Sequence, residues 1–101
     1  IDVTCSQGVG YLIKLGPGQN SGNTFNPRKM QASGSGSTLN YNLFRDSTHS
    51  QIWGDATGGT FIQSGVGVGV TKQFVIYGLI PGGQNVPADS YSDQITVTIE
   101  W

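Results

Sequence analysis

Apolar and polar residues alternate along most of this chain, whereas the 3.6-residue spacing of an amphipathic helix does not recur over any useful length. Clusters of Gly, Pro, Asn and Ser interrupt the alternation at 16–27, 33–37, 54–59 and 81–89. The pattern predicts short strands at 1–5, 11–15, 28–32, 39–44, 72–80 and 91–101, with 28–32 at a sheet edge. Short strands separated by turns are typical of an antiparallel β-sandwich, which is the predicted fold class.

The last of these strands has the most regular alternation. Its polar side chains are Gln94, Thr96, Thr98 and Glu100, and the apolar side chains on its opposite face are Ile95, Val97, Ile99 and Trp101. No sequence follows that could pair with this strand, and natural sheets rarely leave a long hydrophobic edge unprotected. We therefore expect the four apolar residues to line a groove that receives a strand donated by another chain.

The length and composition indicate one domain that spans residues 1–101. Charged residues make up 11% of the chain and its net charge is −1, so no electrostatic field favours nucleic acid as a partner. No apolar stretch approaches the roughly 20 residues that cross a bilayer, so we expect no membrane insertion. The remaining polarity comes from hydroxyls and amides, which is common in extracellular β-proteins.

Residues that could carry chemistry are sparse. His49 is the single histidine, and it shares the short loop 46–50 with Asp46 and Ser50, which cannot arrange a nucleophile, a base and an orienting group in series. We therefore expect a solvated loop there. One histidine and one cysteine provide no metal-ligand spacing, and the glycines at 16–18 lack the Lys and the helix of a phosphate-binding loop. We therefore predict no enzymatic activity, no metal and no cofactor.

Cys5 is the only cysteine, and the chain begins without an initiator Met, a basic segment or an apolar signal segment. Either a signal peptide has been removed or part of the chain lies upstream of Ile1. A single cysteine in a secreted chain indicates either a partner outside the sequence or a free thiol.

The aromatic residues allow two interpretations. Trp53 and Trp101 suit packing in the core or at the final strand, which we favour, because Trp is usually well buried. Alternatively, Trp53 and Trp101 stack on sugar rings, and the chain is a secreted carbohydrate-binding module that uses Trp53, Tyr77 and nearby amides. Tyr91 follows a turn and begins the last strand, so it resembles a tyrosine corner, and nearby Asp89 and Asp93 suit capping roles.

A glycine-rich segment between residues 60 and 70 also has two interpretations. Its apolar members are Phe61, Ile62, Val66, Val68 and Val70. We favour a strand whose glycines admit a close neighbour, because exposed apolar patches are uncommon on stable monomers. The alternative is a surface-contact loop that touches host or abiotic surfaces.

Several short motifs occur in an order that carries a resemblance. They are LNYNLFRD at 39–46, WGD at 53–55, YGLIP at 77–81, YSD at 91–93 and ITVTI at 95–99, with VTC at 3–5 and Arg28 before them. The series resembles the spore coat protein U domain family, which is shared by pilins of archaic chaperone–usher systems. The resemblance covers nearly the whole chain, and the ordered series is more specific than any one motif.

The resemblance implies an incomplete immunoglobulin-like β-sandwich that lacks its own last strand. A periplasmic chaperone would fill the gap first, and the N-terminal segment of a neighbouring pilin subunit would replace it at the outer-membrane usher. The expected product is a homo- or heteropolymeric cell-surface fibre (a pilus or fimbria) or a coat, which supports cell adhesion and biofilm formation. The protein is therefore expected to be secreted through the periplasm and to be structural.

The chain departs from the family in one respect. Family domains begin upstream of the VTC motif, with a donor segment, early strands and a cysteine that forms a disulfide with the residue corresponding to Cys5. The resemblance therefore implies that the chain lacks the N-terminal strands of a fuller domain, and that Cys5 pairs with a cysteine outside this chain.

Overall fold

The structure is a computed structural model that describes all residues from 1 to 101. It contains strands and no helix. The strands are β1 (Asp2–Thr4), β2 (Gly10–Leu15), β3 (Arg28–Ala32), β4 (Thr38–Phe44), β5 (Gln63–Val66), β6 (Thr71–Gln73), β7 (Tyr77–Leu79), β8 (Tyr91–Ser92) and β9 (Val97–Glu100). Every pair of these strands is antiparallel, so the predicted all-β antiparallel fold is confirmed.

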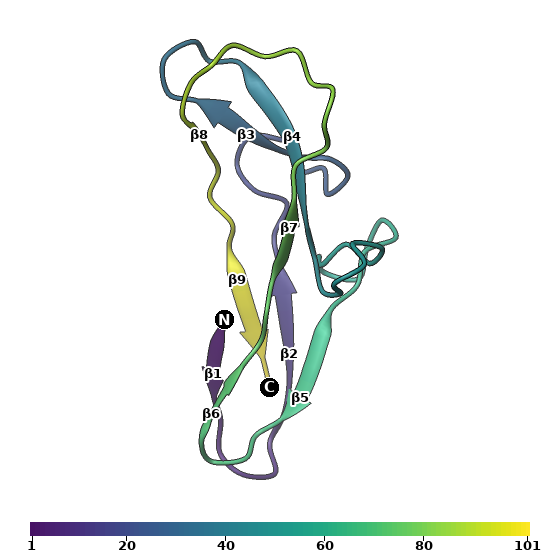
Figure 1. The fold of residues 1–101 in the computed structure, drawn as a ribbon. Coiled ribbons are helices and arrows are strands. Elements are labelled where there is room, and N and C mark those ends of the chain that lie inside the picture. The colour runs from purple at the N-terminus through teal and green to yellow at the C-terminus, as the bar shows by residue number, and fades with distance from the viewer.

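The strands form three sheets, with the orders β1-β6, β5-β2-β9 and β7-β4-β3-β8. Figure 1 shows an elongated molecule in which the four-stranded sheet lies toward one end and the two smaller sheets toward the other. Its extents are 48 × 24 × 23 Å. Both termini lie in the half of the molecule that contains the smaller sheets.

The hydrophobic core lies between these two smaller sheets. Tyr11, Ile13 and Leu15 project from β2, as the alternation predicts, and they meet Val3 of β1 and Phe74, which follows β6. Each such side chain contributes about 1.5–3 kcal/mol when it is fully buried.

Trp53 completes the core and is fully buried. Its indole Nε1 donates a hydrogen bond to the Ile13 carbonyl oxygen at 3.0 Å, so the polar atom of the ring is satisfied. The predicted core role of Trp53 is therefore confirmed.

The two longest predicted strands are each divided in the structure. Residues 72–80 form β6, which pairs with β1, and β7, which pairs with β4 in a different sheet. Residues 91–101 likewise form β8, which pairs with β3, and β9, which pairs with β2. In both segments the chain leaves one sheet and enters another, and the residues between them lie outside any strand.

Two local predictions have opposite outcomes. The prediction that 28–32 is an edge strand is wrong, because β3 lies between β4 and β8. The tyrosine corner is confirmed, because the Tyr91 hydroxyl donates to the carbonyl oxygen of Pro87, four residues upstream, at 2.6 Å.

Candidate functional site: the open edge of strand β9

Strand β9 has a neighbour on one side only. It pairs with β2 from Leu12–Glu100 to Leu15–Val97, and no strand lies on its other side. The Gly16 amide donates to the Thr96 carbonyl oxygen at 2.9 Å, which shows that Thr96 bonds toward β2. Because hydrogen-bonding direction alternates along a strand, Thr98 also bonds toward β2, whereas Val97 and Ile99 direct their N–H and C=O groups to the open edge.

The side chains of the same residues face the core side. Ile95 and Ile99 are half-buried and pack against the core cluster, while Val97 is 44% exposed. Thr96 and Thr98 are exposed on the opposite face. Val97 and Ile99 therefore combine free main-chain groups with apolar side chains that are incompletely covered.

Trp101 does not pack as predicted. It lies beyond the last residue pair, Leu12–Glu100, and is 84% exposed because neither β2 nor the core covers it. Its ring borders two hollows. One, of about 300 Å³, is lined by Thr4, Cys5, Ser6 and Val9. The other, of about 560 Å³, is lined by residues of β2, β5 and β9, which include Leu12, Val66 and Glu100.

Strand β1 borders the first hollow and also has one neighbour, β6. It runs in the same direction as β9 (Figure 1). Ile1 and Phe74 exchange two hydrogen bonds of 2.7 Å, so Asp2 and Thr4 direct their main-chain groups to the open side of β1. Cys5, just after β1, is half-buried and forms no disulfide within the chain. Its pairing with an outside cysteine stays a prediction.

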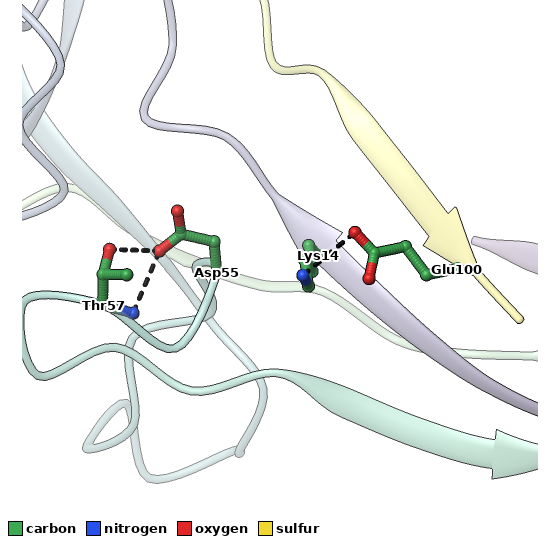
Figure 2. A network of polar contacts seen from close by, with 4 residues as sticks. All are labelled: Lys14, Asp55, Thr57 and Glu100. Atoms are coloured by element: carbon green, nitrogen blue, oxygen red, sulfur yellow. Dashed lines mark hydrogen bonds and ion pairs between the residues drawn. The ribbon is translucent and has the colours of Figure 1, made fainter.

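The opposite face of the β5-β2-β9 sheet carries charged side chains next to the apolar Leu12. Lys14 of β2 and Glu100 of β9 form an ion pair at 3.0 Å (Figure 2). Near them, Asp55 accepts hydrogen bonds from the hydroxyl and the amide of Thr57, also shown in Figure 2, and these bonds lower the pKa of Asp55. This side of β9 carries charged and hydrogen-bonded groups, in contrast to the apolar side chains of its core face.

The glycine-rich segment 61–70 shows features of both a paired strand and a surface-contact loop. Its apolar residues are Phe61, Ile62, Val66, Val68 and Val70. Its residues 63–66 are β5, which pairs with β2, and a Cβ atom at Gly65 would lie 2.6 Å from the Tyr11 hydroxyl oxygen. The glycine therefore admits a close neighbour.

The apolar side chains of the same segment nevertheless remain at the surface. Val66, Val68 and Val70 are each more than half exposed, and Ile62 is half-buried. Phe61 is 38% exposed, and the Arg45 guanidinium carbon lies 4.7 Å from its ring centroid.

Sequence reasoning missed a buried polar cluster centred on Arg28. The side chain is fully buried, and its guanidinium donates to the carbonyl oxygens of Gly16 at 2.7 and 3.0 Å and of Trp53 at 2.6 Å. It also donates to Asn42 Oδ1 at 2.9 Å. The position of Arg28 in the sequence could have indicated its burial, because Arg28 occupies the same face of its strand as Met30 and the buried Ala32.

A second cluster centres on Asp93. Its carboxylate accepts hydrogen bonds from the Tyr41 hydroxyl, from the main-chain amide of Gln19 at 3.0 Å and from Asn20 Nδ2 at 3.0 Å. Burial and the bond to Asp93 raise the pKa of Tyr41 above its ordinary value. Burial lowers the pKa of Arg28, while the charges of Tyr41 and Asp93 act in the opposite direction.

Most residues considered for other chemistry lie apart from the β9 edge. Trp53 is fully buried and cannot stack on a sugar, so of the two tryptophans considered for sugar stacking only Trp101 is exposed. The His49 ring packs edge-on against Phe44 and Tyr77, and it is half-buried rather than solvated.

The loop that holds His49 is organised by Asp46 instead. The hydroxyls of Thr48 and Ser50 donate to the Asp46 carboxylate, which lowers the pKa of Asp46. No set of three His, Cys, Asp or Glu side chains is placed to hold a metal ion. The structure contains no helix with the length and apolar character that a membrane crossing requires.

Comparison with protein families identifies the relationship. A family model for the Spore Coat Protein U domain matches residues 1–98, which is almost the whole chain. The chain belongs to the Spore Coat Protein U domain family. This membership confirms the resemblance inferred from the ordered motifs and indicates a structural protein of the extracellular coat or pilus type.

The chain is also similar in sequence to a curated relative, "Protein U" of Myxococcus xanthus. The two sequences are 38% identical over 72 residues, which cover 71% of this chain. The aligned region spans 39% of that relative's length, so most of the relative has no counterpart here.

Proposed function

We propose that this protein is a non-enzymatic structural subunit of an extracellular fibre or coat, assembled by strand donation at the open edge of β9. In this proposal a periplasmic chaperone covers the edge during transit. At the outer-membrane usher, the N-terminal segment of a neighbouring subunit replaces the chaperone, and the resulting polymer supports adhesion and biofilm formation.

One observation carries the proposal. Val97 and Ile99 each combine main-chain groups directed to an unpaired edge with an apolar side chain on the core side. A strand added there gains main-chain hydrogen bonds and buries its own alternate apolar side chains beside Ile95, Val97, Ile99 and Trp101, which is the β-augmentation mode of recognition. Each fully buried apolar side chain contributes about 1.5–3 kcal/mol before the cost of ordering the donated strand.

The proposal is tested by placing a charge on the groove side of β9. Val97→Asp or Ile99→Asp should abolish the ladder of detergent-resistant oligomers on unheated gels, and fibres in negative-stain images, because an unpaired carboxylate would be buried under the donated strand. Val97→Asp should still reach the periplasm, because Val97 is partly exposed before assembly.

Thr98→Asp is the matched control. Thr98 lies between the two test positions, but its side chain is exposed on the opposite face and its main-chain groups bond toward β2. We expect this variant to assemble normally. Normal fibres from Val97→Asp and Ile99→Asp would refute the proposed groove.

Cys5 enters the proposal as a disulfide to a cysteine outside this chain, in a segment that completes the domain. Intact mass of the native protein without reductant tests this. A species larger than the 10.7 kDa of this chain, which reductant separates at Cys5, is expected, and a free thiol on a 10.7 kDa species would count against the disulfide.

The valines of the 61–70 segment support a second role, contact with external surfaces. Val66, Val68 and Val70 are all exposed in a stretch, 60–71, that contains no charged residue. Replacing all three by Ser should reduce adhesion of assembled fibres to hydrophobic surfaces without changing the oligomer ladder. Unchanged adhesion would exclude this role.

A further inference from the structure

The attachment of β9 to the rest of the molecule is short. It pairs with β2 over four residue pairs, and residues 93–96 before it lie outside any strand. A shift of one residue along β2 would turn Val97 and Ile99 to the outer face, because successive side chains point to opposite faces. The register of β9 therefore decides what its open edge presents.

Arg28 holds the first contact of this strand through the main chain of Gly16. The Gly16 carbonyl oxygen accepts two hydrogen bonds from the guanidinium, while its amide donates to the Thr96 carbonyl oxygen at 2.9 Å. All hydrogen-bond acceptors around the buried guanidinium are carbonyl or amide oxygens. Moving the Gly16 carbonyl would leave part of the buried Arg28 charge without a hydrogen-bond partner, which is costly.

Asp93 holds the chain three residues earlier. Its carboxylate accepts hydrogen bonds from the main-chain amide of Gln19 and from Asn20 Nδ2, three and four residues after Gly16, and from the Tyr41 hydroxyl of β4. Gly18 lies against the same carboxylate with φ +87°, and a Cβ atom there would overlap the carboxylate oxygens. Loop 16–20 is thus hydrogen-bonded to the last segment of the chain at two points, residues 93 and 96.

We propose that Arg28 and Asp93 are positioning residues that set the register of β9 on β2. The effect on assembly rests on the proposed function, whereas the effect on register does not. Neither residue contacts the open edge itself, because both act through loop 16–20.

The test compares Asp93→Asn with Asp89→Asn in the full-length protein. Asp89 lies on the other side of β8 and also clamps a loop, accepting from the amides of Gly34 at 3.1 Å and Ser35 at 3.3 Å. Its hydrogen bonds go to residues 33–35 and to Ser90 and none goes to loop 16–20, so it reports the general cost of losing a carboxylate that caps a turn.

The readout is amide hydrogen exchange measured by NMR. Thr98 and Glu100 report the β9–β2 pairing, and Tyr11 and Ile13, which bond toward β5, serve as the internal reference.

In Asp93→Asn we expect protection of Thr98 and Glu100 to fall about tenfold, the loss that accompanies removal of a hydrogen bond to a charged group. Protection of Tyr11 and Ile13 should stay unchanged, and Asp89→Asn should leave both groups of amides unchanged. A merely structural role would lower protection in β5 and β9 together.

Tyr41→Phe provides a second variant, because it removes one donor to Asp93 and keeps the ring. It should reduce protection of Thr98 and Glu100 by a smaller factor than Asp93→Asn, and it decides the question if Asp93→Asn does not fold. Unchanged β9 protection in the variants that fold would overturn the positioning role. The two proposals can also fail separately. If Asp93→Asn reduces the protection of Thr98 and Glu100 but the wild-type protein forms no oligomers, the positioning role is supported and the proposed function is refuted.

Discussion

Strands β2 and β9 have almost the same pattern of residues but different surroundings. Both direct alternate apolar side chains toward the same core, although β2 also carries Leu12 on its outer face. Ile13 and Leu15 of β2 are fully buried, whereas Val97 of β9, the partner of Leu15, is 44% exposed. The difference is that β2 lies between two strands and β9 lies beside one. Alternation identifies the core face, and the number of neighbours decides how well it is covered.

The largest effect should come from truncating the same kind of side chain in each strand. Ile13→Ala should cost about 2–5 kcal/mol of unfolding free energy, because it leaves a cavity in a packed core. Val97→Ala should cost about 1 kcal/mol or less in the unassembled subunit, because its side chain is already partly in water. Urea denaturation of the two variants measures both values. Equal costs would mean that something already covers the β9 edge.

A smaller effect should come from the close approach between the end of β5 and the segment that joins β1 to β2. A Cβ atom at Gly67, which is buried just after β5, would overlap the Ser6 carbonyl oxygen. Gly67→Ala should therefore cost about 1–3 kcal/mol, as overpacking does.

Gly10→Ala is the control for this substitution, because Gly10 begins β2 and nothing lies within 4 Å of a Cβ atom there. We expect it to be close to neutral in thermal denaturation. If Gly67→Ala were equally neutral, the tight approach at the end of β5 would not matter for stability.

The smallest effect should come from the ion pair that joins β2 to β9 directly. Lys14 and Glu100 are partly exposed, so Glu100→Gln should cost about 0.2–1 kcal/mol at low ionic strength. The difference from the wild type should vanish in roughly 1 M salt, where charges are screened within about 3 Å. A difference that persists in high salt would show that packing, rather than charge, joins the strands at this position.

Local patterns predicted the strands and their faces well. Residues 28–32 form β3 with the predicted bounds, Tyr11, Ile13 and Leu15 are buried together, and Tyr91 forms its corner. Each of these features depends on residues close together in the chain.

The predictions that failed concern partners distant in the chain. Whether β3 is central, whether residues 72–80 stay in one sheet and whether Trp101 is covered all depend on which other strands lie alongside. Arg28 was not recognised as buried because its carbonyl partners come from Gly16 and Trp53, which are 12 and 25 residues away.

The sequence by itself determined that this protein is all-β, which side chains of each strand face the core, and to which family it belongs. The tertiary structure decided that β2 is enclosed and that β9 is open on one side. It also decided that the buried Arg28 guanidinium hydrogen-bonds to Gly16, whose amide makes the first contact with the last segment of the chain. The physical reason is that alternation is a property of neighbouring residues. Coverage instead depends on pairings such as Lys14 with Glu100, which join residues 86 positions apart.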